Sequence, residues 1–110
     1  MLRMLLFVLI LLPFSSMAGN GGKGKVTLIE FNANGVILFR HTGARTDVPS
    51  CVGNNFRNRW AIDAKTDAGK AQLSGILTAY STGKDVTVIG TNSCSLWGDT
   101  ETVRYFYISG

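Results

Sequence analysis

Residues 25–41 read KVTLIEFNANGVILFRH and decide the fold of this chain. Two runs rich in β-branched and aromatic residues, 25–31 and 36–41, stand on either side of a short polar segment that ends in Asn34-Gly35. An Asn-Gly pair between two such runs is the strongest short-range signal for a β-hairpin, because both residues tolerate a positive φ. The stretch therefore predicts two antiparallel strands joined by a tight turn.

A long loop and a third strand follow the hairpin. Residues 42–55 are polar and contain Pro49 and two glycines, which is typical of a loop. Residues 59–64, RWAIDA, then predict a strand that places Trp60 and Ile62 on the same face. We expect Trp60 to be a core residue.

The pattern changes from strand to helix at residues 66–82. Apolar residues recur there at three- and four-residue steps, which places them along one stripe of a helix. Thr66 or Asp67 suits the N-cap, and Gly83 is placed to end the helix in a left-handed conformation. The segment therefore predicts a single amphipathic helix.

The order of elements defines the fold class. Residues 85–90 and 103–109 predict two further strands, whereas the glycine-rich residues 20–25 predict a mobile lead-in. A mainly β domain with three strands, one helix and two strands favours a five-stranded Greek-key barrel of the oligonucleotide/oligosaccharide-binding type (OB-fold), with the helix plugging one end. The alternative is a helix packed across an ordinary antiparallel sheet.

The first 18 residues, MLRMLLFVLILLPFSSMA, have the layout of a secretory signal peptide. One positive charge at Arg3 precedes an apolar run over residues 4–12, and a small-residue ending places the cleavage site after Ala18. The apolar run is shorter than the roughly 20 residues that span a membrane. We therefore expect residues 1–18 to be removed, residues 19–110 to form a single domain without membrane insertion, and the protein to be periplasmic or secreted.

The predicted export affects how the net charge and the two cysteines are interpreted. Removing Arg3, the single charged residue among residues 1–18, lowers the net charge from +4 to +3, far from the dense basic surface of a nucleic-acid binder. The only cysteines, Cys51 and Cys94, predict a disulfide in an oxidising compartment, worth about 4 kcal/mol by loop closure. The alternatives are free thiols, or a nucleophilic cysteine with His41 as its base.

Catalytic and metal chemistry have little support in the sequence. His41 is the only histidine, so a multi-histidine metal site is excluded, and we expect no metal or cofactor. Asp99 and Glu101 have the character of the paired carboxylates of a glycosidase. The interpretation we favour is that Asp99 and Thr100 turn the chain into the last strand while Glu101 meets a basic neighbour. We therefore expect a protein that is not an enzyme.

A ligand-binding loop is the remaining candidate, within residues 93–101, SCSLWGDTE. Trp97 stands beside Asp99 and near Asn92, and an aromatic ring next to hydrogen-bonding side chains can stack on a sugar while the polar groups bind its hydroxyls. The alternative is that Trp97 covers the disulfide and the end of the barrel. The candidate ligand-binding residues are thus Trp97, Asp99 and Asn92.

Several of these features together resemble small exported bacterial proteins that are similar to the B subunit of subtilase cytotoxin. The residues that carry the resemblance are Cys51, Arg59-Trp60, Ala68-Gly69-Lys70, Ala79-Tyr80, Gly83-Lys84, Val86, Gly90-Thr91, Cys94-Ser95, Trp97 and Glu101. The resemblance implies the OB-fold barrel, glycan binding and a pentameric ring, as in the B components of AB-type toxins. The sugar-binding residues of that toxin lie in its N-terminal part, where this chain has GNGGKGKV, so no sugar-contacting residue carries over.

The sequence thus predicts an exported non-enzymatic binding protein whose partner is a glycan or another cell-surface ligand, as a homo-oligomeric ring and without nucleic acid. The alternative function is a periplasmic structural or protein-interaction module that binds no sugar and uses an open strand edge.

Overall fold

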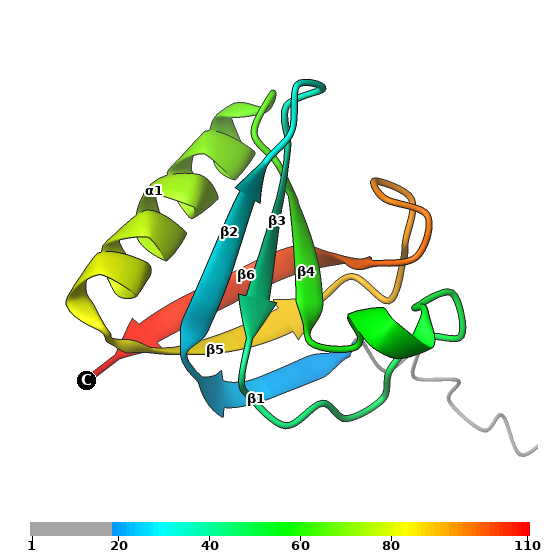
Figure 1. The fold of residues 1–110 in the computed structure, drawn as a ribbon, viewed down its shortest axis with the longest axis horizontal. Helices are drawn as coiled ribbons and strands as arrows, with labels where there is room; N and C mark the ends of the chain where they lie inside the picture. Colours follow the sequence, from blue (N-terminus) through cyan, green and yellow to red (C-terminus); the bar gives the residue numbers. More distant parts are fainter. Residues whose placement is uncertain (1–18) are drawn as a thin grey trace, which may run out of the picture.

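The computed structural model describes residues 19–110, so the predicted signal peptide lies outside the described residues. The described part is mainly β with one α-helix (Figure 1). Its elements are β1 (Asn20–Gly24), β2 (Val26–Phe31), β3 (Val36–His41), the short 3-10 helix η1 (Asn54–Phe56), β4 (Arg59–Asp63), α1 (Asp67–Thr82), β5 (Asp85–Gly90) and β6 (Glu101–Ser109).

The predicted hairpin is confirmed as β2 and β3, which pair antiparallel with Phe31 opposite Ile37. The turn differs in detail from the expectation, because Gly35 takes a positive φ of 82° and Asn34 does not. The side chain of Asn34 instead accepts a hydrogen bond from the backbone N–H of Val36 at 3.1 Å. Asn34 therefore supports the turn through its side chain.

The strands form one six-stranded sheet in the order β1-β5-β6-β4-β3-β2. Neighbouring strands are antiparallel except β4 and β6, which are parallel. In Figure 1 the half of the sheet made by β2, β3 and β4 crosses the half made by β1, β5 and β6. The helix α1 lies beside β2 in this view and contacts β2, β4 and β6. The two edge strands, β1 and β2, are separated in the chain by Lys25 alone.

The prediction of five strands was wrong by one, because residues 20–24 are a strand and not a lead-in. β1 pairs with β5, with Gly24 opposite Val86. Its glycines are required by close packing: a Cβ at Gly21 would press on the ring of Trp60, and a Cβ at Gly24 would overlap the backbone of Gly43. A strand in which three of five residues are glycine has no alternating pattern of apolar and polar side chains from which it can be recognised.

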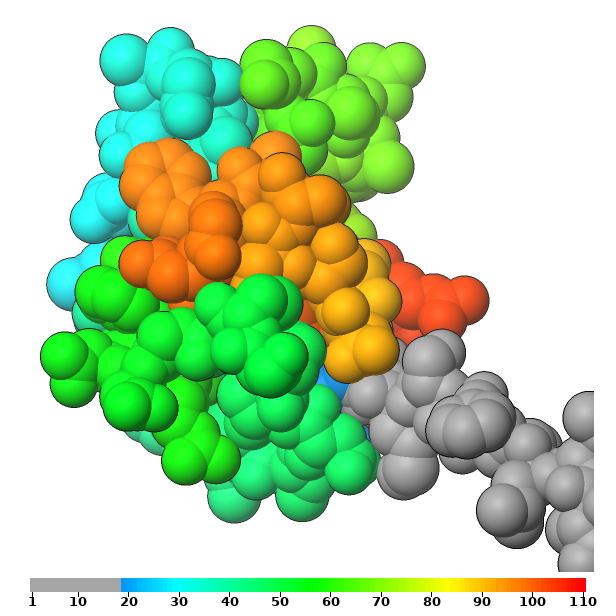
Figure 2. All heavy atoms as spheres, turned by 90° about the vertical axis from the view of Figure 1, so that its right-hand side faces the viewer, coloured from blue at the N-terminus to red at the C-terminus, as the bar shows by residue number. Residues whose placement is uncertain are grey.

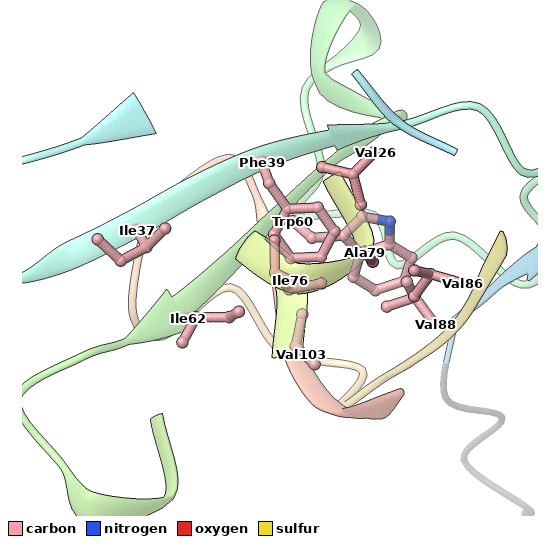
Figure 3. Close-up of a cluster of buried hydrophobic side chains, with 10 residues drawn as sticks. All are labelled: Val26, Ile37, Phe39, Trp60, Ile62, Ile76, Ala79, Val86, Val88 and Val103. Carbon is pink, nitrogen blue, oxygen red and sulfur yellow. The ribbon is translucent and has the colours of Figure 1, made fainter. Parts of the chain in front are cut away.

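The main core lies between the two halves of the sheet and α1 (Figure 3). Trp60 is completely buried at the centre of this cluster, which confirms its predicted role. The buried members are Val26, Ile37, Phe39, Trp60, Ile62, Ile76, Ala79, Val86, Val88 and Val103. A second, smaller cluster, formed by Val36, Leu38 and Ala61, lies on the opposite face of β3 and β4.

The predicted helix is confirmed with both of its end signals. Thr66 is the N-cap, and its side chain accepts a hydrogen bond from the backbone N–H of Gly69 at 2.9 Å. Gly83 ends the helix with a φ of 67°. Ile76 and Ala79 face the core from α1. No helix within residues 19–110 has the length and apolar character needed to cross a membrane.

Candidate functional site

Two loops meet at one end of the molecule, residues 42–58 and residues 91–100. Figure 2 shows them in contact, with the second loop in orange above the first in green. The disulfide between Cys51 and Cys94 joins them, which confirms the predicted pairing and excludes a free nucleophilic cysteine. We call this surface the loop end.

A buried ion pair lies beneath the loop end. The guanidinium of Arg45 donates to Oε1 of Glu101 at 2.5 Å, and their side chains are 5% and 0% exposed. The same guanidinium stacks on Trp60, 4.0 Å from the ring centroid. Glu101 therefore meets a basic neighbour, as predicted, and its carboxylate holds the loop to the core.

The second carboxylate oxygen of Glu101 binds the backbone. Oε2 accepts hydrogen bonds from the N–H of Gly19 at 3.1 Å and from the N–H of Asn92 at 2.9 Å. Asn92 adopts a positive φ of 62°, and its side chain is exposed. The backbone of Asn92 is thus fixed by the same carboxylate that anchors Arg45.

Asp99 is held by a separate partner at the surface. Its Oδ1 accepts from Nη2 of Arg59 at 2.7 Å and from the hydroxyl of Thr100 at 3.1 Å. Arg59 also stacks on Phe56, 3.8 Å from the ring centroid. The backbone N–H of Thr100 donates to the carbonyl of Trp97 at 3.0 Å, which confirms the predicted turn into the last strand.

Trp97 is half-buried. With Leu96, its indole packs on the small cluster of Val36, Leu38 and Ala61, on the outer face of β3 and β4. No hydrogen bond joins the side chains of Trp97, Asp99 and Asn92 to one another within residues 19–110. The three predicted ligand-binding residues therefore lie on one loop, but no hydrogen bond connects their side chains.

His41, the last residue of β3, is buried, and both nitrogens of its ring are hydrogen-bonded to backbone groups. Its Nε2 donates to the carbonyl of Val86 at 2.7 Å, and its Nδ1 accepts from the N–H of Gly43 at 3.3 Å. Burial lowers the pKa of His41 below its usual value of 6.5, against the opposing effect of the Val86 hydrogen bond. These contacts define a neutral imidazole with a structural role.

The described residues offer neither an enclosed nor a metal-binding site. No ligand-sized cavity opens among residues 19–110, and no cluster of three or more His, Cys, Asp and Glu is placed there to hold a metal ion. Sequence reasoning missed Arg45, the partner of Glu101, because the two residues are 56 positions apart and Arg45 stands in a loop without a recognisable motif.

Removing Arg45 should destabilise the protein strongly. In Arg45→Met the carboxylate of Glu101 stays buried and loses the guanidinium that pairs with Oε1, which costs about 3–5 kcal/mol of unfolding free energy. Guanidinium unfolding measures this loss. The matched control is Arg104→Met, an exposed arginine on β6, which should change stability by less than about 0.5 kcal/mol. Equal effects of the two substitutions would show that the buried pair contributes nothing.

Stability should fall on mild acidification because of His41. Its pKa is lower in the folded protein than the unfolded value of 6.5, so the unfolded state binds more protons, and stability is lost as the pH falls below 6.5. Urea unfolding between pH 7.5 and 5 measures this slope, which His41→Gln should flatten. Asp85, whose pKa is lowered by the hydrogen bond from Lys25, titrates in a separate, more acidic range. A slope that persists in His41→Gln contradicts this assignment.

Comparison with protein-family models, with curated proteins and with solved structures found no match to this chain. The resemblance to the toxin B subunits therefore depends on the sequence features alone. The chemistry of the loop end and the arrangement of the strands carry the functional argument.

Proposed function

We propose that this chain is an exported, non-enzymatic binding protein that recognises a glycan or another cell-surface ligand at the loop end. The observation that carries the proposal is that Trp97, half-exposed, stands on a loop fixed by the Cys51–Cys94 disulfide and by the ion pair of Asp99 with Arg59. A surface fixed in this way loses little conformational entropy on binding.

The groups at this surface suit a sugar. An indole offers an apolar face for stacking on the ring, and carboxylate or amide groups bind hydroxyls. Oδ1 of Asp99 is engaged by Arg59 and Thr100, whereas Oδ2 has no hydrogen bond within residues 19–110. Asn92 adds an exposed amide. These groups provide one stacking surface, one acceptor and one donor.

The titratable groups considered for catalysis have internal partners, which supports a non-enzymatic role. Glu101 is completely buried and binds Arg45 and two backbone N–H groups. His41 is bound to backbone groups on both ring nitrogens. A general acid or base must reach a proton of the substrate, which neither group can do in this arrangement.

The strand arrangement supports an OB-fold as the scaffold. β1 and β2 follow one another with only Lys25 between them, β1 pairs with β5 and β2 pairs with β3. Counted as one bent strand, they give five strands in which the first neighbours both the second and the fourth, and α1 lies between the third and fourth. This connectivity supports the barrel that the sequence pattern favours.

A second candidate function, protein interaction including ring assembly, is favoured by two strands that lack a strand partner along part of one side. Within residues 19–110, the edge strand β2 pairs only with β3. The inner strand β6 pairs with β4 only at Glu101 and Thr102, and its carbonyl at Arg104 accepts from the side chain of Gln72 on α1. Exposed apolar side chains accompany both strands, with Phe31 61% exposed on β2 and Tyr107 53% exposed on β6. Unpaired sides of this kind can pair with a strand of another chain.

Trp97→Ala should weaken glycan binding by the purified chain 19–110 on a glycan array by at least about tenfold, because the stacking surface is lost. Trp97→Phe keeps an aromatic face and should retain most of the binding. Thermal unfolding of each variant identifies losses that come from uncovering Val36, Leu38 and Ala61. Absence of glycan binding in the unsubstituted chain, or binding unaffected by Trp97→Ala, contradicts a sugar site on this loop.

Assembly through the strand edges should appear in sedimentation velocity as an oligomer at micromolar concentration. A charge on β2 should prevent it, so Phe31→Lys is expected to sediment as a monomer. Tyr80→Lys changes a side chain of similar exposure on α1 and serves as the control that keeps the oligomer. A monomeric unsubstituted chain contradicts the ring.

A further inference from the structure

Gly19 occupies the position that directly follows the predicted cleavage site, and its backbone is held on both sides. Its N–H donates to Oε2 of Glu101 at 3.1 Å, and its carbonyl accepts from the N–H of Gly90 at 2.7 Å. The residue is buried. A main-chain nitrogen is thus fixed against a buried carboxylate at the point where the mature chain is expected to begin.

We propose that the α-ammonium of Gly19, created when the leader is removed, binds Glu101 and thereby makes the processed chain more stable than the unprocessed one. The proposal depends on the predicted cleavage after Ala18 and is independent of the ligand. A signal peptidase adds water across the Ala18–Gly19 peptide bond, leaving a carboxylate on Ala18 and an ammonium group on Gly19. The carboxylate of Glu101 is therefore an intramolecular binding site for the mature N-terminus.

The geometry suits an ammonium group. Oε1 of Glu101 is occupied by Arg45, so the two positive groups would bind different oxygens of one carboxylate. Before cleavage Gly19 offers a single neutral N–H, whereas afterwards it offers a charged donor with three hydrogens. Hydrogen bonds between charged partners are roughly twice as strong as neutral ones.

The site also accepts only glycine at its first position. A Cβ on Gly19 would overlap the carboxylate of Glu101 and crowd Arg45, and a Cβ on Gly90 would overlap Glu101 and crowd Trp60. Cleavage one residue earlier would leave Ala18 as the first residue and keep Gly19 as a neutral amide. The binding site at Glu101 is thus specific for a chain that begins at Gly19.

The contact reaches the sheet through β1. Asn20, the first residue of β1, lies opposite Ile89 of β5 and exchanges two backbone hydrogen bonds with Thr46. Fixing Gly19 therefore fixes the start of β1 between β5 and the loop of Arg45. A gain at the N-terminus is expected to stabilise the pairing of β1 as well.

The test compares two chains that differ by one residue, 19–110 and 18–110, each released from a fusion with a defined N-terminus. We expect the chain that begins at Gly19 to have the higher Tm by about 4–8 °C, the shift that a 1 kcal/mol difference gives in a domain of this size. In the Glu101→Gln background the difference should disappear. Equal Tm values in the unsubstituted background, or a difference unchanged by Glu101→Gln, would overturn the proposal.

A second measurement leaves the core intact in case Glu101→Gln does not fold. Acetylating the α-amine of the chain 19–110 removes its charge, and the Tm should fall at least as far as that of the chain 18–110. No change on acetylation overturns the proposal. The intact mass of the protein exported from its native host must also correspond to a chain that begins at Gly19, and a different N-terminus overturns it.

Discussion

The structure depends on a charged group buried against an aromatic core. Glu101 and Arg45 lie between the loop end and Trp60, with Arg45 stacked on the indole and Glu101 bound to the backbone of Gly19 and Asn92. A buried ion pair is weak evidence for net stability, since desolvation offsets much of the attraction. The ion pair instead determines where three segments lie, because the carboxylate of Glu101 binds the start of β1, the loop of Arg45 and the loop that carries Trp97.

The elements that could be predicted from sequence are those whose signals are local. The β2–β3 hairpin, the capped helix and the disulfide each follow from a pattern within a short segment or from a choice of one pairing. β1 could not be predicted, because its glycines pack closely on the backbone of Gly43 and Ala44 and on the ring of Trp60, and because its sequence, NGGKG, has no alternating pattern. Its position depends on tertiary packing.

The candidate site likewise contains features with a local sequence signal and features that depend on tertiary packing. A turn at Asp99 and Thr100 and a basic partner for Glu101 were predicted, but the identity of that partner required the fold, since Arg45 comes from a distant loop. The packing of Trp97 did have a signal that sequence reasoning missed. Residues 36–39, VILF, are apolar on both faces of the strand, and all four are buried, so something must cover the outer face.

The need to cover the outer face of β3 and β4 limits how Trp97 could act in the proposed binding of a ligand. One side of its indole is used to cover Val36, Leu38 and Ala61, so only the remaining surface is available to a ligand. Such an arrangement holds the ring in place before binding, which lowers the entropic cost of stacking. In the proposed binding mode this packing also links recognition to the core. A substitution that loosens β3 or β4 would release the ring, and the affinity would fall without any change in the residues proposed to touch the ligand.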